Sequence, residues 1–146
     1  MSEKITLKNP KVVKWFLLIH FFIGLAFTLI FVFIPDLFLS FIGWPISVPN
    51  DQPALFGYRI LGVAILGLSS SSLLIFQKDE YPEIIVIMVM ECIWFAIAFS
   101  MMLTGHILFG LPLTALFIDI ILIALFFTFL SLLWIEHDHY LQEVGG

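Results

Sequence analysis

Four long apolar stretches alternate with short polar segments along the chain. They cover residues 12–34, 54–76, 84–104 and 113–135, and each contains only one or two ionisable side chains. A helix needs roughly 20 apolar residues to cross a hydrocarbon core of about 30 Å. A helix also satisfies its own backbone hydrogen bonds where water is absent. The pattern therefore predicts an all-α bundle of four transmembrane helices that forms one domain over residues 1–146.

Proline and glycine mark the ends of these stretches. The first stops at Pro35, the third starts after Pro82, and the fourth follows Pro112. Proline is tolerated in the first turn of a helix and disrupts a helix interior. We expect the third helix to break at Gly105. The first apolar stretch is longer than that of a signal peptide, so we expect it to be retained as a span.

The basic residues lie on one side of the predicted spans. Lysines precede or begin the first span and one lies between the second and third: Lys4, Lys8, Lys11, Lys14 and Lys78. Residues 35–53 and 105–112 contain no Lys or Arg. Positively charged short segments stay in the cytoplasm, so we expect both termini there. The formal net charge of -5 argues against nucleic acid as a partner.

The connection after the first span is too apolar for a free loop. Residues 36–44 predict a short helix that lies in the membrane interface, with Trp44 at headgroup depth. Residues 41–47 (FIGWPIS) also resemble residues 108–114 (LFGLPLT), and Ala-Leu-Phe follows both, at Ala54 and Ala115. This match favours two helix hairpins related by duplication. Chance similarity between apolar sequences is the alternative.

Four ionisable side chains lie inside the predicted spans. Each costs about 2.5 to 3.5 kcal/mol at the bilayer centre, so such groups face protein or water. From a rise of about 1.5 Å per residue, Arg59 and Asp119 lie about 7 to 9 Å below one surface, and His20 and Glu91 about 10 to 12 Å from the other. We predict an Arg59–Asp119 ion pair and a His20–Glu91 contact. These pairs either neutralise charge and fix helix register or form a polar path in which His20 and Glu91 exchange protons.

The second stretch is rich in small residues, including Gly62, Ala64, Gly67 and Ser71. Ala64, Gly67 and Ser71 share one helix face, which allows close approach between membrane helices. This pattern indicates the centre of the bundle or of a homodimer. For the serines, a hydroxyl-lined substrate wall is the alternative.

The remaining polar residues predict no catalytic, cofactor or metal site. Cys92 lies in an apolar stretch and is expected to be a buried free thiol. Residues 136–139 (EHDH) contain metal-capable side chains but are expected to be a solvated polar flank. Haem ligation by His20 would need a second histidine at equal depth, and His106 lies near the opposite surface.

Residues 58–68 (YRILGVAILGL) resemble the Arg-x-x-Gly helix of the DoxX-like group of small four-helix membrane proteins. The Pro35–Asp36 stretch with its Gly-Trp-Pro turn and the position of Asp119 are similar to the same pattern. The resemblance covers most of the chain in topology and few residues in detail. It implies the fold, and some members are associated with membrane oxidoreductase or redox-stress complexes. It implies no catalytic residue.

These features favour a non-enzymatic membrane protein that packs in the lipid bilayer against itself or a larger membrane complex. One alternative is a proton-coupled or small-molecule transporter, with a water-accessible cavity that reaches Glu91 or Arg59. Another is an enzyme acting on a lipid or quinone through Glu91 or Asp119, with a lipid-sized pocket that ends at a carboxyl; it lacks a nucleophile beside a base. A packing subunit predicts a dry, closed bundle with an apolar patch around Gly67.

Overall fold

The computed structural model describes residues 5–43, 52–78, 80–110 and 113–145. The described residues contain four long helices, a short helix and one 3-10 turn: α1 (Pro10–Phe33), α2 (Pro35–Phe41), α3 (Gln52–Ile75), α4 (Tyr81–Phe109), η1 (Leu113–Ala115) and α5 (Leu116–Gly145). Each long helix is long and apolar enough to cross a membrane. The predicted all-α four-helix fold is therefore confirmed, and the chain is a multi-pass membrane protein.

Two helices are longer than the apolar pattern predicts. α4 continues through Gly105 and ends before Gly110, which adopts a left-handed conformation with φ 63°. The expected break at Gly105 is wrong, because a single glycine costs a helix only about 1 kcal/mol relative to alanine. A terminal glycine with positive φ is a common helix stop. α5 continues through the polar tail to Gly145.

Short helix α2 lies where residues 36–44 predict one, but Trp44 is outside the described residues. Prolines occupy the first turns of α1, α2 and α4, as their fixed φ favours. Leu39 and Ile42 of this segment are buried against Leu55 of α3 and Ala115 of η1. The α2 segment therefore connects both halves of the molecule at one end.

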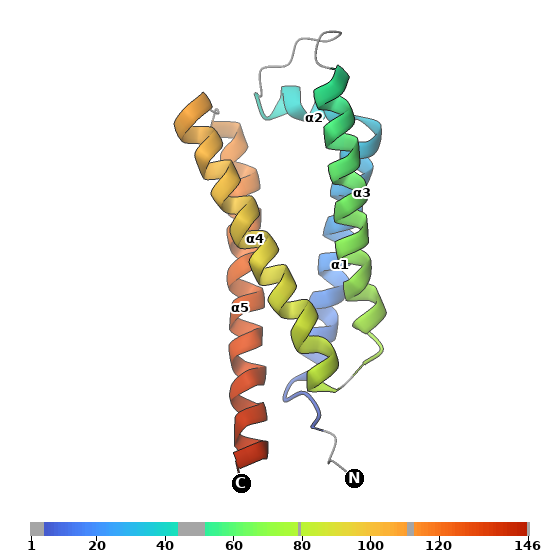
Figure 1. The fold of residues 1–146 in the computed structure, drawn as a ribbon, viewed down its shortest axis with the longest axis vertical. Coiled ribbons are helices and arrows are strands. Elements are labelled where there is room, and N and C mark those ends of the chain that lie inside the picture. The colour runs from blue at the N-terminus through green and yellow to red at the C-terminus, as the bar shows by residue number, and fades with distance from the viewer. Residues whose placement is uncertain (1–4, 44–51, 79, 111–112, 146) are drawn as a thin grey trace.

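The long helices pair as two antiparallel hairpins. α1 packs along α3 and α4 packs along α5, whereas α3 meets α4 over a short stretch (Figure 1). Both chain termini lie at the same end of the molecule, which we call the terminal end, and α2 lies at the other, the α2 end (Figure 1). α4 lies close to the α1–α3 hairpin near the terminal end and away from it at the α2 end (Figure 1).

Small residues bring α1 and α3 together. A Cβ added to Gly24 of α1 would lie 2.4 Å from the Cβ of Ser69, and one added to Gly62 of α3 would lie 3.0 Å from Phe31 Cβ. The hydroxyl of Thr28 donates a hydrogen bond to the carbonyl of Gly62 at 3.0 Å. Gly62 thus lies at a helix contact.

The rest of the predicted small-residue face lies away from α1. Ala64 and Gly67 are exposed, and Ser71 is half-buried. A Cβ at Gly67 would meet nothing within 4 Å. Ala64 and Gly67 are thus on the surface of the bundle rather than at its centre, and a homodimer through this face stays a prediction.

The main core joins the two hairpins in the half nearer the terminal end. Its members come from α1, α4, α5 and the segment before α1, and include Leu17, Ile84, Met88 and Phe129, each at most 1% exposed. Cys92 is a buried free thiol at the edge of this core. Because this core and the smaller α2-end cluster lie at different levels, the hairpins enclose space between them.

Candidate functional site

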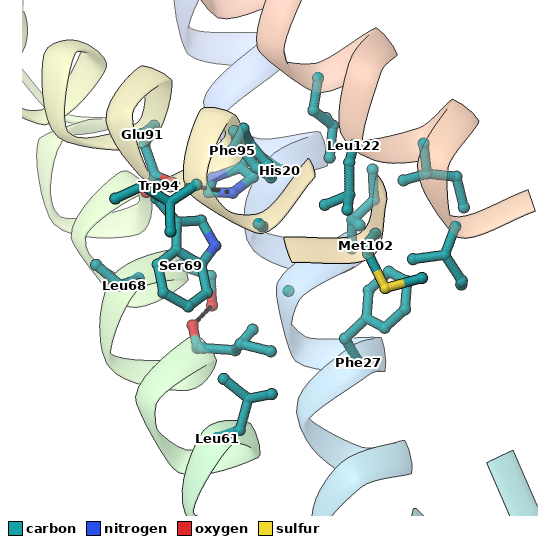
Figure 2. Close-up of a pocket in the computed structure, with 18 of the residues that line it drawn as sticks. His20, Phe27, Leu61, Leu68, Ser69, Glu91, Trp94, Phe95, Met102 and Leu122 are labelled. Carbon is teal, nitrogen blue, oxygen red and sulfur yellow. Dashed lines mark hydrogen bonds and ion pairs between the residues drawn. The ribbon is translucent and has the colours of Figure 1, made fainter. Parts of the chain in front are cut away.

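A cleft of about 320 Å³ lies between the two hairpins and is lined by all four long helices (Figure 2). Its walls are aliphatic and aromatic side chains, including Phe27, Leu61, Trp94 and Met102. On α1 the lining extends from His20 to Phe31, a length of about 16 Å along a helix. The cleft is therefore an elongated apolar space within the membrane-spanning part of the molecule.

His20 and Glu91 lie together at the end of this cleft that adjoins the main core. His20 Nε2 and Glu91 Oε2 are 3.6 Å apart, and both residues are buried. The His20 ring packs against Phe95 and Phe129 at centroid distances of 5.6 and 5.1 Å. The structure thus brings together the two residues for which the sequence predicts a contact.

The Glu91 carboxyl has no hydrogen bond within the part of the chain that the structure describes. The other ring nitrogen of His20, Nδ1, is 2.9 Å from the Ser72 hydroxyl, whereas the 3.6 Å separation from Glu91 exceeds hydrogen-bond distance. Neither carboxyl oxygen of Glu91 has a hydrogen-bond partner among the described residues, and Glu91 is 1% exposed. Buried carboxyl groups without partners are rare and call for an explanation.

Nearby serines do not supply that partner. The Ser69 hydroxyl, which also lines the cleft, donates to the Ile65 carbonyl at 2.8 Å, and the Ser71 hydroxyl donates to the Leu68 carbonyl. These bonds within α3 are the usual way in which a helix satisfies a buried hydroxyl. The hydroxyl protons of Ser69 and Ser71 are therefore used within their own helix, and of these two residues Ser69 lines the cleft.

Asp119 has a different partner from the predicted one. Its Oδ2 is 2.7 Å from His106 Nε2, between α5 and α4. Arg59 lies exposed on α3, and no Arg59–Asp119 ion pair occurs among the described residues. The expected pairing required α3 and α5 to be neighbours. Each of them instead packs along the other member of its own hairpin, so equal depth does not bring the two side chains together.

A second buried glutamate, Glu136, holds the terminal end together. Its carboxylate accepts hydrogen bonds from the backbone N–H groups of Lys8 at 2.6 Å and Asn9 at 3.1 Å. Glu136 is 1% exposed, so the expectation that residues 136–139 form a solvated flank is wrong at this position. Glu136 follows Phe129 and Leu132 at seven- and four-residue spacing, and this continuation of a buried helix face is the signal that could have identified it.

The start of α4 joins the same cluster at the terminal end. The Tyr81 hydroxyl is 2.7 Å from His137 Nδ1, and the Tyr81 ring stacks on Tyr140 with centroids 4.5 Å apart. Thr6 and Glu80 form an isolated β-bridge. The segment before α1 is thus attached to both α4 and α5.

The described residues contain no group of three His, Cys, Asp or Glu side chains that could hold a metal ion. Comparison with models of protein families, with curated proteins and with solved structures finds no match. The cleft and the buried His20–Glu91 pair at its end are therefore the candidate functional site.

Proposed function

We propose that this protein is a non-enzymatic membrane protein that takes one apolar or amphiphilic molecule from the bilayer into the cleft between its hairpins. The observation that carries this proposal is an apolar cleft inside the membrane-spanning region that ends at a buried carboxyl with no hydrogen-bond partner in the described segments. Ligand sites combine mostly apolar walls with a few polar groups that orient the ligand. The cleft has this composition.

The position of the cleft supports entry from the lipid phase. Ile97 and Met101 of α4 line the cleft and are 52% and 71% exposed. The cleft thus communicates with the surface of the bundle along α4, where α4 lies away from α3. At this level the surroundings are lipid, so a molecule dissolved in the bilayer reaches the site without crossing water.

An accessory or self-associating role is the second candidate. Ala64 and Gly67 leave an exposed face of small residues on α3, and such faces allow close packing between membrane helices. A partner on this face is compatible with a ligand in the cleft. Membership of the DoxX-like group, cytoplasmic termini and an interfacial position for α2 stay part of this proposal.

Ligand entry is tested by fluorescence quenching in nanodiscs. We retain Trp94, which lines the cleft, and replace Trp15, Trp44 and Trp134 with Phe. We expect bromoundecanol, a neutral brominated amphiphile, to quench Trp94 with a saturable component. A second variant that retains only Trp134, which is 75% exposed, should show quenching that rises with the probe concentration in the bilayer and does not saturate.

Filling the cleft supplies the matched control. Ala98 lines the cleft, whereas Ala96, two residues earlier on α4, is exposed and outside the lining. Ala98→Phe should abolish the saturable quenching of Trp94, and Ala96→Phe should leave it unchanged. Linear quenching of Trp94 in the variant that retains only this tryptophan would show that the probe does not occupy the cleft, and the proposal would be wrong.

A further inference from the structure

The polar end of the cleft has acidic character. Glu91 is a carboxyl, and the described lining residues include no Lys or Arg. An anionic headgroup at this end would meet Glu91 without a counter-charge, which is unfavourable where the dielectric constant is low. Fatty acid carboxylates and lipid phosphates therefore do not suit this site.

The Glu91 carboxyl can exist there in two neutralised forms. An ionised carboxylate without a partner is costly in apolar surroundings, and Glu91 is 1% exposed with neither oxygen hydrogen-bonded among the described residues. Its charge is cancelled either by a proton, on the carboxyl or on the His20 ring 3.6 Å away, or by a cation that enters the cleft. A cation with an apolar body could fill the rest of the cleft.

Aromatic rings surround the path that such a cation would take. Trp94 and Phe95 follow Glu91 on α4, and Phe27, Phe31 and Tyr58 line the cleft farther toward the α2 end. Figure 2 shows Trp94 and Phe95 beside Glu91 and His20. The faces of aromatic rings attract cations, and indole does so most strongly. The cleft thus joins one acidic group to several rings.

We infer that the cleft binds a lipophilic cation, such as a quaternary ammonium or phosphonium ion with an apolar body, in exchange for a proton on Glu91. This inference rests on the proposed function and names the class of its ligand. When the cation enters, the Glu91 O–H bond breaks, the proton leaves to solvent and the carboxylate pairs with the cation. The net charge of the site is the same before and after the exchange.

Protonation of the titratable groups near Glu91 either weakens cation binding, as protonation of Glu91 does, or takes place farther from the carboxyl. His20 of α1 faces the carboxyl at 3.6 Å, and a proton on its ring would repel an entering cation. Cys92 is the next residue on α4, and Tyr58 of α3 lines the cleft one helix turn or more toward the α2 end. The α5 side chains that line the cleft are aliphatic. Acid therefore weakens cation binding through both Glu91 and His20.

Two ions of similar shape and opposite charge test this inference. We measure the binding of tetraphenylphosphonium and tetraphenylborate to the full chain in nanodiscs of zwitterionic lipid by equilibrium dialysis, with protein-free nanodiscs as the blank. We expect saturable phosphonium binding at least about tenfold tighter than borate binding. On the acid side the phosphonium affinity should fall by up to about tenfold per pH unit, and binding should release about one proton per cation in weak buffer.

A charge-removing variant identifies the group involved. Glu91→Gln should weaken phosphonium binding at least about tenfold. Glu83→Gln is the matched control on α4, because the Glu83 side chain is 41% exposed and pairs with Lys78; it should bind phosphonium like the parent protein.

The outcomes separate this inference from the proposed function. Equal affinity for the two ions, or unchanged phosphonium affinity in Glu91→Gln, would overturn the cation site while bromoundecanol binding still supports ligand entry. Absence of saturable binding by both bromoundecanol and phosphonium would overturn both. If Glu91→Gln does not fold, proton release by the parent protein decides: binding without release contradicts the exchange.

Discussion

Two glutamates of the described segments are equally buried but have opposite surroundings. Glu91 and Glu136 are each 1% exposed. Glu136 accepts hydrogen bonds from two backbone amides, whereas neither oxygen of Glu91 has a hydrogen-bond partner among the described residues. Burial by itself therefore does not tell what a carboxyl does. The hydrogen bonds of Glu136 join two segments of the fold, whereas Glu91 is the carboxyl that we propose contacts a ligand.

The two groups also lie in regions with different packing. The Glu136 carboxylate accepts hydrogen bonds from the backbone N–H groups of Lys8 and Asn9, the residues just before α1. A negative charge at this position complements the positive end of the helix dipole. This contact ties α5 of one hairpin to α1 of the other. Glu91 lies at the boundary between the main core and the cleft, where the hairpins are no longer in continuous contact.

The largest expected effect comes from removing the hydrogen-bonded carboxyl. Glu136→Ala leaves two amide N–H groups without their acceptor, and we expect a loss of about 2 kcal/mol in the free energy of unfolding. The measurement is unfolding by sodium dodecyl sulfate in mixed micelles. Glu143→Ala, at an exposed position on the same helix, should change this free energy by less than about 0.5 kcal/mol. Equal behaviour of the two variants would show that the Glu136 contacts contribute nothing to stability.

The apolar pattern was sufficient to predict the fold, because each span must exclude water over a length set by the bilayer. The same reasoning about depth placed His20 level with Glu91. It also placed Arg59 level with Asp119, but the ion pair predicted from this is not found among the described residues, since depth along a span says nothing about which helices are neighbours. Asp119 contacts His106 of its own hairpin instead.

Glu136 was not predictable from its residue type. A polar tail after a span is usually solvated, and only the spacing from Phe129 and Leu132 indicates a buried face. A pocket that reaches Glu91 was predicted only for the alternative functions, the transporter and the enzyme, because the cleft depends on the angle at which α4 leaves the α1–α3 hairpin (Figure 1). That angle depends on packing between helices that are all apolar, so hydropathy carries no information about it.

A smaller effect is expected from the tyrosine at the terminal end. Tyr81→Phe removes the 2.7 Å hydrogen bond to His137 but keeps the ring that stacks on Tyr140. We expect a loss of about 1 kcal/mol in the free energy of unfolding. His137→Ala should cost a similar amount, and the double variant should cost clearly less than the sum of the two, because both changes remove the same bond. If the losses of the two single variants simply added in the double variant, the Tyr81–His137 hydrogen bond would contribute nothing to the free energy of unfolding.

The smallest expected effect is that of replacing Glu91, and we expect the free energy of unfolding to respond differently to the same substitution at the two glutamates. Glu91→Met replaces a carboxyl that has no hydrogen bond among the described residues with an apolar side chain of similar length, and we expect no loss, or a gain below about 1 kcal/mol, in the free energy of unfolding. Glu136→Met, the matched substitution at the hydrogen-bonded carboxyl, should lose about 2 kcal/mol in the same mixed-micelle assay. If Glu91→Met were as destabilising as Glu136→Met, Glu91 would be a structural group whose contacts hold the hairpins together. An unbonded carboxyl would then not mark a ligand site in this bundle, and the case for the cleft would have to rest on its shape alone.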